Sequence, residues 1–270
     1  MLYTLDSNTN NITPQYCVNN TYATLPPGVY DLKINRDYHR PTVYIRQLST
    51  FKLPTKIYGT LTSMQNRILR TYQDRPFSTG VLLNGNKGSG KTLLSQMISN
   101  TAVGTLKIPV ILVNDYMHSA EFAVIAEYLQ NLGQPAVLVF DEFEKKTEGR
   151  YQIELLAFLD GVIHQQKMLY LFITNSDAPI NEYYKERPGR IFYHFRFRGL
   201  DEDAIRTYIR AALKNTSYTE PLVTLLKTFP EVNFDVLASI VEEMNRYDMS
   251  PKEAVDGMNA PWVDTPAAFG

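Results

Sequence analysis

Short apolar runs alternate with helical spacing of apolar residues through the middle of the chain. The runs lie at residues 80–84, 108–114, 136–141 and 168–174. Strands that are buried on both faces of a parallel sheet are almost continuously apolar in this way. Helical spacing predicts helices at 62–72, 91–103, 119–132 and 150–165, and Thr62 and Gln65 have the spacing of a capping box in the first of these. The middle of the chain therefore predicts an α/β fold, with a parallel sheet covered by helices.

The two ends of the chain have different patterns. The first 54 residues are rich in Tyr, Asn and Thr, and strand-like runs at 29–34 and 42–48 predict a small β-rich unit. After about residue 200 only helical spacing is found, and the last helix has a capping pattern in Ser250, Pro251 and Glu253. We expect helices there at 204–213, 219–229, 235–247 and 251–258. The expected domains are a β-rich N-terminal unit (1–54), an α/β domain (55–199), a helical lid (200–260) and a tail (261–270).

Composition and charge exclude some classes of protein. Of the 270 residues, 44% are hydrophobic and 20% are charged, which is typical of a globular chain, and the formal net charge is −1. A near-neutral chain has no overall electrostatic attraction to nucleic acid or to an anionic membrane. The sequence has no apolar run of about 20 residues, no signal-peptide pattern and a single cysteine, Cys17. We therefore expect a cytoplasmic protein with no membrane association.

A glycine-rich loop between the first buried run and the following helix carries the most specific chemistry. The loop matches G-x-x-x-x-G-K-[ST] at every fixed position, in Gly85, Asn86, Lys87, Gly88, Ser89, Gly90, Lys91 and Thr92. Successive backbone N–H groups of such a loop converge on phosphate oxygens, next to the positive end of a helix. Lys91 is expected to reach the β and γ phosphates, Thr92 to ligate magnesium, and Leu93 to lie beside the nucleotide. The loop therefore predicts ATP and Mg²⁺ as cofactors.

Two carboxylates follow the third buried run directly. The run at 136–140 leads into Asp141 and Glu142, about fifty residues beyond the glycine-rich loop. An apolar strand that ends in this way is typical of a site in which the aspartate holds magnesium. Hydrolysis needs a base in line with the γ phosphate, and Glu142 is placed to polarise the attacking water. The pair predicts a magnesium ligand in Asp141 and a catalytic base in Glu142.

Two further polar features lie downstream. Asn175 ends the fourth buried run, where its amide is placed to bond both the attacking water and the γ phosphate, although Asn at a strand exit is also an ordinary turn residue. The stretch Arg187, Pro188, Gly189 and Arg190 then predicts a tight turn. Such a turn presents two guanidinium groups close together, and guanidinium groups bind phosphate well.

The order GNKGSGKT, LVFDE, ITN and RPGR, followed by a helical lid, resembles the AAA ATPases over about residues 55–258. The resemblance implies a P-loop NTPase sheet, a ring of subunits that is a hexamer, and Arg187 and Arg190 as fingers in the neighbouring subunit's ATP site. It also implies that Ile57, Tyr58 and Gly59 surround adenine. The arrangement is most similar to the Bcs-type translocases and the phage-encoded AAA ATPases, and for the latter the expected location is the host cytoplasm.

The chain also departs from the family's pattern. The spacing between Asn175 and Arg187 is one residue longer than usual, which leaves open which arginine reaches the phosphate. Arg206 and Arg210 are spaced at i and i+4, so a solvated helix face explains them better than a phosphate sensor in the lid. The usual pore loop is not recognisable. The available pore candidates, for which core packing is the alternative, are Tyr116, Met117 and Phe122.

Three functions are compatible with these patterns. The leading hypothesis is a magnesium-dependent ATPase, converting ATP and water to ADP and phosphate, that forms homo-oligomeric rings and remodels or translocates a macromolecule, with protein as the favoured substrate. The alternative is a nucleic-acid-associated loader or a replication-type ATPase of the wider AAA+ class. The mildly basic N-terminal unit leaves nucleic-acid binding open, although a solvated surface also explains its charge. The third is a nucleotide-dependent scaffold without turnover, against which the full set of catalytic residues argues.

Overall fold

The structure is a computed structural model of the whole chain, and it describes residues 2–6, 11–15, 21–22, 24–36, 41–115, 119–146, 167–175 and 191–258. The chain divides into two compact units. The first, which we name the sheet unit, comprises Met1–Leu53, Ser63–Asn84 and Lys91–Arg196. The second, the helical unit, comprises Pro54–Thr62, Gly85–Gly90 and Phe197–Gly270. The glycine-rich loop is thus grouped with the helical residues, while the domain boundaries expected from the sequence stay a prediction.

A ten-stranded sheet organises the sheet unit, in the order β10-β6-β9-β8-β7-β4-β5-β2-β1-β3. Adjacent strands from β6 to β4 in this order are parallel, and those from β4 to β3 are antiparallel. The four buried runs of the sequence are confirmed as β6, β7, β8 and β9. The strands are β1 (Leu2–Asp6), β2 (Asn11–Gln15), β3 (Thr21–Tyr22), β4 (Val29–Asn35), β5 (Thr42–Leu48), β6 (Thr79–Gly85), β7 (Val110–Val113), β8 (Ala136–Phe140), β9 (Met168–Thr174) and β10 (Tyr193–Phe197).

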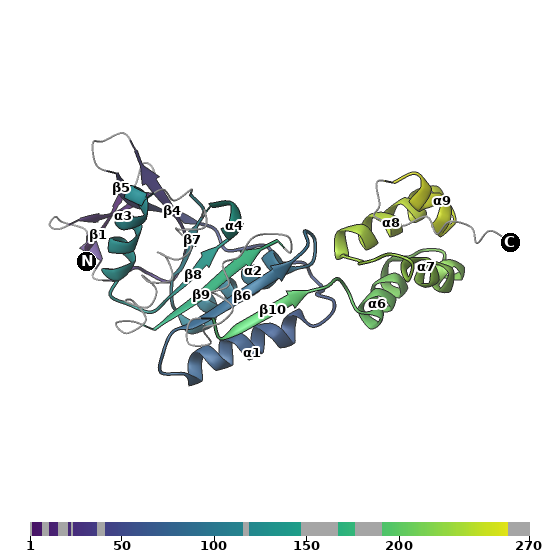
Figure 1. Cartoon of the computed structure of the whole chain (residues 1–270), viewed down its shortest axis with the longest axis horizontal. Coiled ribbons are helices and arrows are strands. Elements are labelled where there is room, and N and C mark those ends of the chain that lie inside the picture. Colours follow the sequence, from purple (N-terminus) through teal and green to yellow (C-terminus); the bar gives the residue numbers. More distant parts are fainter. Residues whose placement is uncertain are drawn as a thin grey trace. The chain divides into compact units, whose positions relative to one another are not determined.

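The β-rich character of the N-terminal residues is confirmed, and their strands continue the central sheet (Figure 1). β4 pairs in parallel with β7, where Val29 lies opposite Val110, and it pairs antiparallel with β5. The side chain of Asp31 is buried in this region and accepts from Lys33 and Arg46 at 3.2 and 3.4 Å. A buried carboxylate is tolerated when cations and donors surround it.

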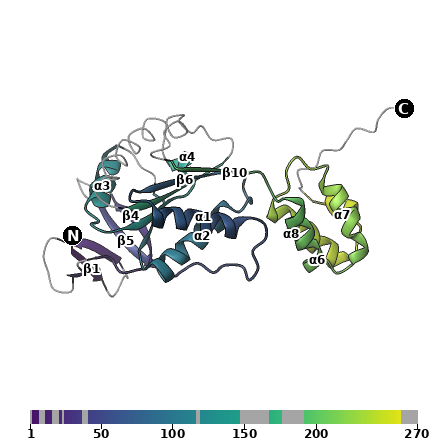
Figure 2. The ribbon, with the colours of Figure 1, turned by 90° about the horizontal axis from the view of Figure 1, so that it is seen from below.

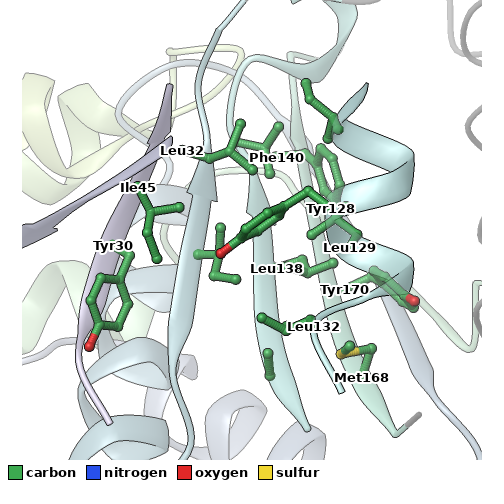
Figure 3. Packing of buried hydrophobic residues seen from close by; sticks show 14 of the residues in the cluster. Tyr30, Leu32, Ile45, Tyr128, Leu129, Leu132, Leu138, Phe140, Met168 and Tyr170 are labelled. Carbon is green, nitrogen blue, oxygen red and sulfur yellow. The ribbon is translucent and has the colours of Figure 1, made fainter. Parts of the chain in front are cut away.

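Alternate residues of the strands divide between the two faces of the sheet, as the period of two requires. On one face, the side chains form a continuous apolar core with α3 (Ser119–Gln130) and α4 (Phe143–Lys146), in which three phenylalanines stack at centroid distances of 5.0 to 6.2 Å. Figure 3 shows part of this core. Members that it labels include Tyr30, Leu32, Tyr128, Leu129, Leu138, Phe140, Met168 and Tyr170.

The opposite face is covered by α1 (Leu61–Asp74) and α2 (Lys91–Thr101), after which Ala102–Leu106 form a π-helical turn (Figure 2). The predicted capping box in the first helix is wrong. The helix begins at Leu61, which places Thr62 inside its first turn, and the Gln65 amide donates instead to Thr101 Oγ1 at 2.7 Å and to the carbonyl of Met97 at 3.0 Å. This tertiary contact between α1 and α2 takes the place of the local one.

The helical unit contains α6 (Glu202–Ala212), a 3₁₀ turn (Thr216–Tyr218), α7 (Thr219–Leu226), α8 (Phe234–Tyr247) and α9 (Pro251–Asp256), which enclose their own apolar core. The lid helices expected from the sequence are confirmed. So is the last capping pattern, in which the Ser250 hydroxyl accepts from the Glu253 N–H, and the Glu253 carboxylate accepts from the Ser250 N–H. Arg206 pairs with Glu202 and Glu220 on an exposed face, in agreement with the expected solvated surface.

No helix among the described residues is both long and apolar enough to cross a membrane. The helix expected at 150–165 lies outside the described residues.

Candidate functional site

The glycine-rich loop is joined to the sheet unit at both ends, through β6 before it and α2 after it. We call residues 85–90 the phosphate loop. Gly88 has φ +74° and Gly90 φ +96°, in the left-handed region that favours glycine. A Cβ at Gly85 would lie 2.5 Å from the backbone oxygen of Phe197. The predicted strand, loop and helix are therefore confirmed, and two of the glycines are needed for backbone conformation and one for close packing.

Lys91 and Thr92 begin α2 directly after the loop. The Lys91 residue is 6% exposed, whereas Thr92 is exposed. This arrangement suits a cation and a hydroxyl that face a bound, magnesium-associated phosphate chain, and Leu93 follows them in the first turn, half-buried.

The carboxylates at the end of β8 lie where the sequence predicts them. Asp141 Oδ1 accepts from the Glu142 N–H at 2.9 Å, which orients the Asp141 side chain. Glu142 has φ +49°, an uncommon conformation for a residue with a side chain, and such strain is frequent at functional sites. Its Oε1 accepts from Lys145 Nζ at 2.5 Å, and its side chain is 44% exposed. Glu142 is therefore accessible to water and held in an unusual backbone geometry.

Hydrogen bonds join the ends of β6 and β9 to the helix that follows β8. Asn84 donates to Thr174 Oγ1 at 3.1 Å and to the backbone carbonyl of Asn175 at 3.2 Å. The side-chain amide of Asn175 donates to Glu144 Oε1 at 2.6 Å, and its N–H donates to the same atom at 3.3 Å. Asn175 is thus brought to the edge that carries Asp141, and its amide is fixed by a carboxylate.

Sequence reasoning missed Glu144. Its Oε2 is buried and has no hydrogen-bond partner among the described residues, while Oε1 accepts both bonds from Asn175. A buried carboxylate oxygen without a partner is costly, and such groups are retained mainly where they serve a function. The available signal was its position two residues after Glu142, in the short helix that follows β8.

The fit of a magnesium ion follows from the donors present. Asp141 and Thr92 both belong to the sheet unit and supply carboxylate and hydroxyl oxygens, which magnesium prefers. No group of three or more acidic, His or Cys side chains suited to a metal is found in the described part of the chain. Magnesium in nucleotide sites takes one or two protein ligands and completes its shell with water and phosphate, so this sparse donor set fits the predicted ion.

The residues predicted around adenine lie in an aromatic cluster of the helical unit. The Tyr58 ring meets Tyr208 edge-on at 5.2 Å and stacks on Phe234 at 5.9 Å, and the last two rings are 5.0 Å apart. Lys56 Nζ lies 4.9 Å from the centre of the Tyr58 ring. Burial, together with the nearby Tyr58 and Glu242, raises the pKa of Tyr208, which therefore stays a neutral donor. The cluster is defined as Tyr58, Tyr208 and Phe234.

Ile57 and Gly59 flank the cluster, and a Cβ at Gly59, which has φ +73°, would lie 3.8 Å from Ala204. Sequence reasoning missed Tyr208 and Phe234. Tyr208 falls on the apolar face of its helix, a position typical of core packing, and Phe234 stands at a helix start. Aromatic rings are the side chains on which nucleobases stack.

The segment that leads into α8 contacts the phosphate loop within the helical unit. Asn86 donates to Glu231 Oε2 at 2.5 Å, and the Asn233 side chain donates to the carbonyl of Lys87 at 3.1 Å. The N–H of Phe234 donates to the carbonyl of Gly88 at 3.3 Å. Asn233 is also the N-cap of α8 and accepts from the Val236 N–H. None of these partners of the loop was expected from the sequence.

Some predicted residues lie outside the described part of the chain. These are Arg187 and Arg190 of the expected finger turn and the pore candidates Tyr116 and Met117, whereas Phe122 belongs to α3. The assignment of these residues stays a prediction.

Part of the chain is similar to a known family of proteins. Residues 81–198 match the model of the AAA family, the ATPases associated with various cellular activities. The chain is 29% identical over 215 residues to a protein of Corynebacterium efficiens named "AAA ATPase forming ring-shaped complexes", and 29% identical over 190 residues to one of the same name from Corynebacterium diphtheriae. These matches cover 66% and 60% of this chain but only 40% and 37% of the relatives. Residues 81–198 of the chain, less than half of its length, are therefore similar to the AAA domain of these ATPases.

Structural comparison gives the fold. A chain in the structure of the HORMA:CdnC:Trip13 complex of E. coli MS115-1 aligns with a TM-score of 0.53 at 14% identity, over 76% of this chain and 86% of that one. At this identity the likeness concerns the fold, which is confirmed as the P-loop NTPase α/β fold with a helical lid. The finer resemblance to Bcs-type and phage-encoded ATPases stays a prediction.

Proposed function

We propose that the protein is a magnesium-dependent ATPase that works in a homo-oligomeric ring on a macromolecule. The observation that carries this proposal is the arrangement at the sheet edge. The phosphate loop leaves β6, the Asp141–Glu142 pair leaves β8 and Asn175 leaves β9, and the three strands are neighbours in a parallel sheet. The carboxyl ends of parallel strands meet at one edge, where such sheets bind their ligands.

Each residue has a role in this proposal. Lys91 binds the β and γ phosphates, and Thr92 and Asp141 would hold the magnesium ion, which when bound neutralises phosphate charge. Glu142 takes the proton of the attacking water as the water oxygen bonds to the γ phosphorus, and the bond from that phosphorus to the β–γ bridging oxygen breaks, with ADP as the leaving group. Asn175, whose amide is oriented by Glu144, places that water. Proton transfer and positioning together account for hydrolysis without a covalent intermediate on the chain.

The aromatic cluster would receive the base. Stacking between a base and an aromatic ring stabilises binding by roughly 1 to 3 kcal/mol. The three rings belong to the helical unit, as the phosphate loop does. Ile57 and Gly59 would complete the contacts to adenine.

Oligomerisation and the substrate are the finer parts of the proposal. The two Corynebacterium relatives are named for ring-shaped complexes, which supports a ring here, and we propose a hexamer with Arg187 and Arg190 acting on the neighbouring subunit's ATP. A protein is the proposed substrate, in the cytoplasm. Stimulation of hydrolysis by DNA that falls steeply with salt would favour a nucleic-acid loader instead.

The experiment that tests the proposal uses Glu142→Gln. We expect ATP binding to be retained and turnover to fall by about 10²- to 10⁴-fold, because the group that takes the proton is lost while the phosphate contacts remain. Nucleotide affinity and phosphate release are measured separately. Hydrolysis at the parent rate would reject Glu142 as the base, and absence of ATP binding by the parent protein would reject the function.

A further inference from the structure

Three consecutive residues of the phosphate loop are bonded to one segment of the helical unit. The bonds run from Asn86 to Glu231, from Asn233 to Lys87 and from Phe234 to Gly88, at 2.5, 3.1 and 3.3 Å. Asn233 is fixed as well by its capping bond to α8. The segment 231–235 is therefore held in register against the loop, and its charged side chains have defined places there.

Two carboxylates of this segment lie against the loop. Asp235 Oδ2 is only 2.6 Å from the point where a Cβ at Gly88 would lie. Glu231 Oε2 accepts from Asn86, while its Oε1 is buried without a hydrogen-bond partner in the described part of the chain. A Cβ at Gly199 would lie 2.9 Å from Glu231 Cγ, so the Glu231 side chain is packed closely on that side. The loop thus faces negative charge from its own chain.

This charge acts on whatever anion the loop binds. A carboxylate about 7 Å from a phosphate charge changes an equilibrium constant by roughly 3- to 50-fold per unit charge, depending on the local dielectric. Magnesium cancels about two of the charges of a nucleoside triphosphate, so the repulsion is much smaller for the magnesium complex than for the free nucleotide. Carboxylates beside the loop therefore weaken the binding of the free nucleotide more than the binding of its magnesium complex.

We propose that Glu231 and Asp235 make the phosphate loop selective for nucleotide that already carries a divalent cation, and that Asn233 positions them. This inference rests on the proposed function, because it requires that the loop binds ATP. Glu231 and Asp235 act as specificity-determining residues: they weaken binding of free ATP more than binding of magnesium-ATP. The segment 231–235 would thus favour magnesium-ATP over free ATP. A basic residue at the same place would instead strengthen the binding of both.

The test measures the dissociation constant of ATP with magnesium and with EDTA, at low ionic strength, by titration calorimetry. The variants are Glu231→Gln, Asp235→Asn and the double variant. We define the selectivity ratio as the dissociation constant measured with EDTA divided by the one measured with magnesium. We expect this ratio to fall by about tenfold for each charge removed, mainly because free ATP then binds more tightly. The effect should shrink at high salt, since screening weakens exposed charges. Asn233→Ser, which keeps a capping hydroxyl but loses the amide that reaches Lys87, should lower the ratio in the same direction.

Two controls separate local charge from general effects. Asp256→Asn makes the same change of charge at an exposed position at the end of α9 and should keep the parent ratio. Asp235→Glu keeps the charge and should keep a high ratio. Thermal melts of every variant establish that the fold is retained, and Glu231→Gln alone is sufficient if the Asp235 variants do not fold.

Two results would overturn the inference. One is an unchanged ratio in the double variant, and the other is weaker binding of magnesium-ATP when the charges are removed, which would make the carboxylates cation ligands. If the parent protein binds and hydrolyses magnesium-ATP but the variants leave the ratio unchanged, only the selectivity for magnesium-ATP is rejected. A parent that binds no ATP rejects the proposed function and the inference together.

Discussion

The phosphate loop is held in two different ways by the two units of the molecule. It is covalently continuous with β6 and α2 of the sheet unit, and it is bonded non-covalently to the segment 231–235 of the helical unit. The sheet unit supplies a lysine and a hydroxyl at the loop's end, whereas the helical segment supplies two carboxylates and an amide. The groups expected to attract phosphate are thus fixed by chain connectivity, and those expected to limit its binding depend on tertiary contacts that can be broken.

The largest expected loss of hydrolysis comes from Arg187 and Arg190, which belong neither to the phosphate loop nor to the segment 231–235. If Arg187 and Arg190 act on a neighbouring subunit, a chain with both changed to Ala should lose hydrolysis by about 10³- to 10⁵-fold, as should a Lys91→Ala chain. Mixing the two inactive proteins should restore part of the activity, because some interfaces then combine an intact loop with intact fingers. The rate of phosphate release is measured in mixtures shown to co-assemble.

Failure of such mixtures to recover activity would mean that the two units of one chain hold the complete site. Full activity of a strictly monomeric parent protein would lead to the same conclusion. Either result would mean that hydrolysis by one chain does not depend on a second chain.

The next effect concerns the sheet edge. Glu144→Ala should lower the maximal rate by about 10- to 100-fold and leave the affinity for ATP unchanged, because a charged hydrogen bond that orients Asn175 is lost. Glu144→Gln keeps an acceptor oxygen and should recover most of the rate. The maximal rate and KM are determined separately for both variants. A fall in affinity equal to the fall in rate would identify Glu144 as a ligand of the nucleotide rather than a positioning residue.

The contribution of the helical unit to base recognition should be smaller. Tyr208→Leu should weaken ATP binding by about tenfold, since one stacking face is lost, but should leave binding of inorganic tripolyphosphate unchanged. Tyr218→Leu changes a half-buried tyrosine of the same unit and serves as the matched control. Equal weakening of ATP and tripolyphosphate by Tyr208→Leu would show that the cluster shapes the loop and does not bind the base.

The sheet unit and its motifs could be predicted well from the sequence, and the partners of the loop could not. Buried strands read as continuous apolar runs, and Lys91, Asp141 and Glu142 occupy fixed places relative to those runs. Glu144, Tyr208 and Asp235 have no such local pattern, because their roles come from contacts between residues far apart in the chain. Asn86 and Glu231, for example, are separated by 145 positions.

The Thr62–Gln65 interpretation failed for a related reason. The local spacing was suitable for a capping box, but α1 begins before Thr62, and the Gln65 side chain reaches Met97 and Thr101 across the helix pair. A local pattern predicts a local bond only when no tertiary partner competes for the same side chain. Ser250 had no such competitor, and its capping box is present.

The smallest effect is expected at this capping box. Ser250→Ala should lower the free energy of unfolding by about 1 kcal/mol, because the Glu253 N–H loses its acceptor, the Ser250 hydroxyl. ATP affinity should not change. A thermal melt and a titration check both parts. A clear loss of affinity would mean that the far end of the helical unit is coupled to the phosphate loop.

The extension of the sheet by β4 and β5 has a mechanical consequence. The ladder between β4 and β5 joins seven residue pairs, and the one between β4 and β7 joins four. A force applied along β4 would load these hydrogen bonds together, in shear, and they would have to break almost at once. A pull on the N-terminal strands would therefore be carried directly into the sheet, in which β6 leads into the phosphate loop.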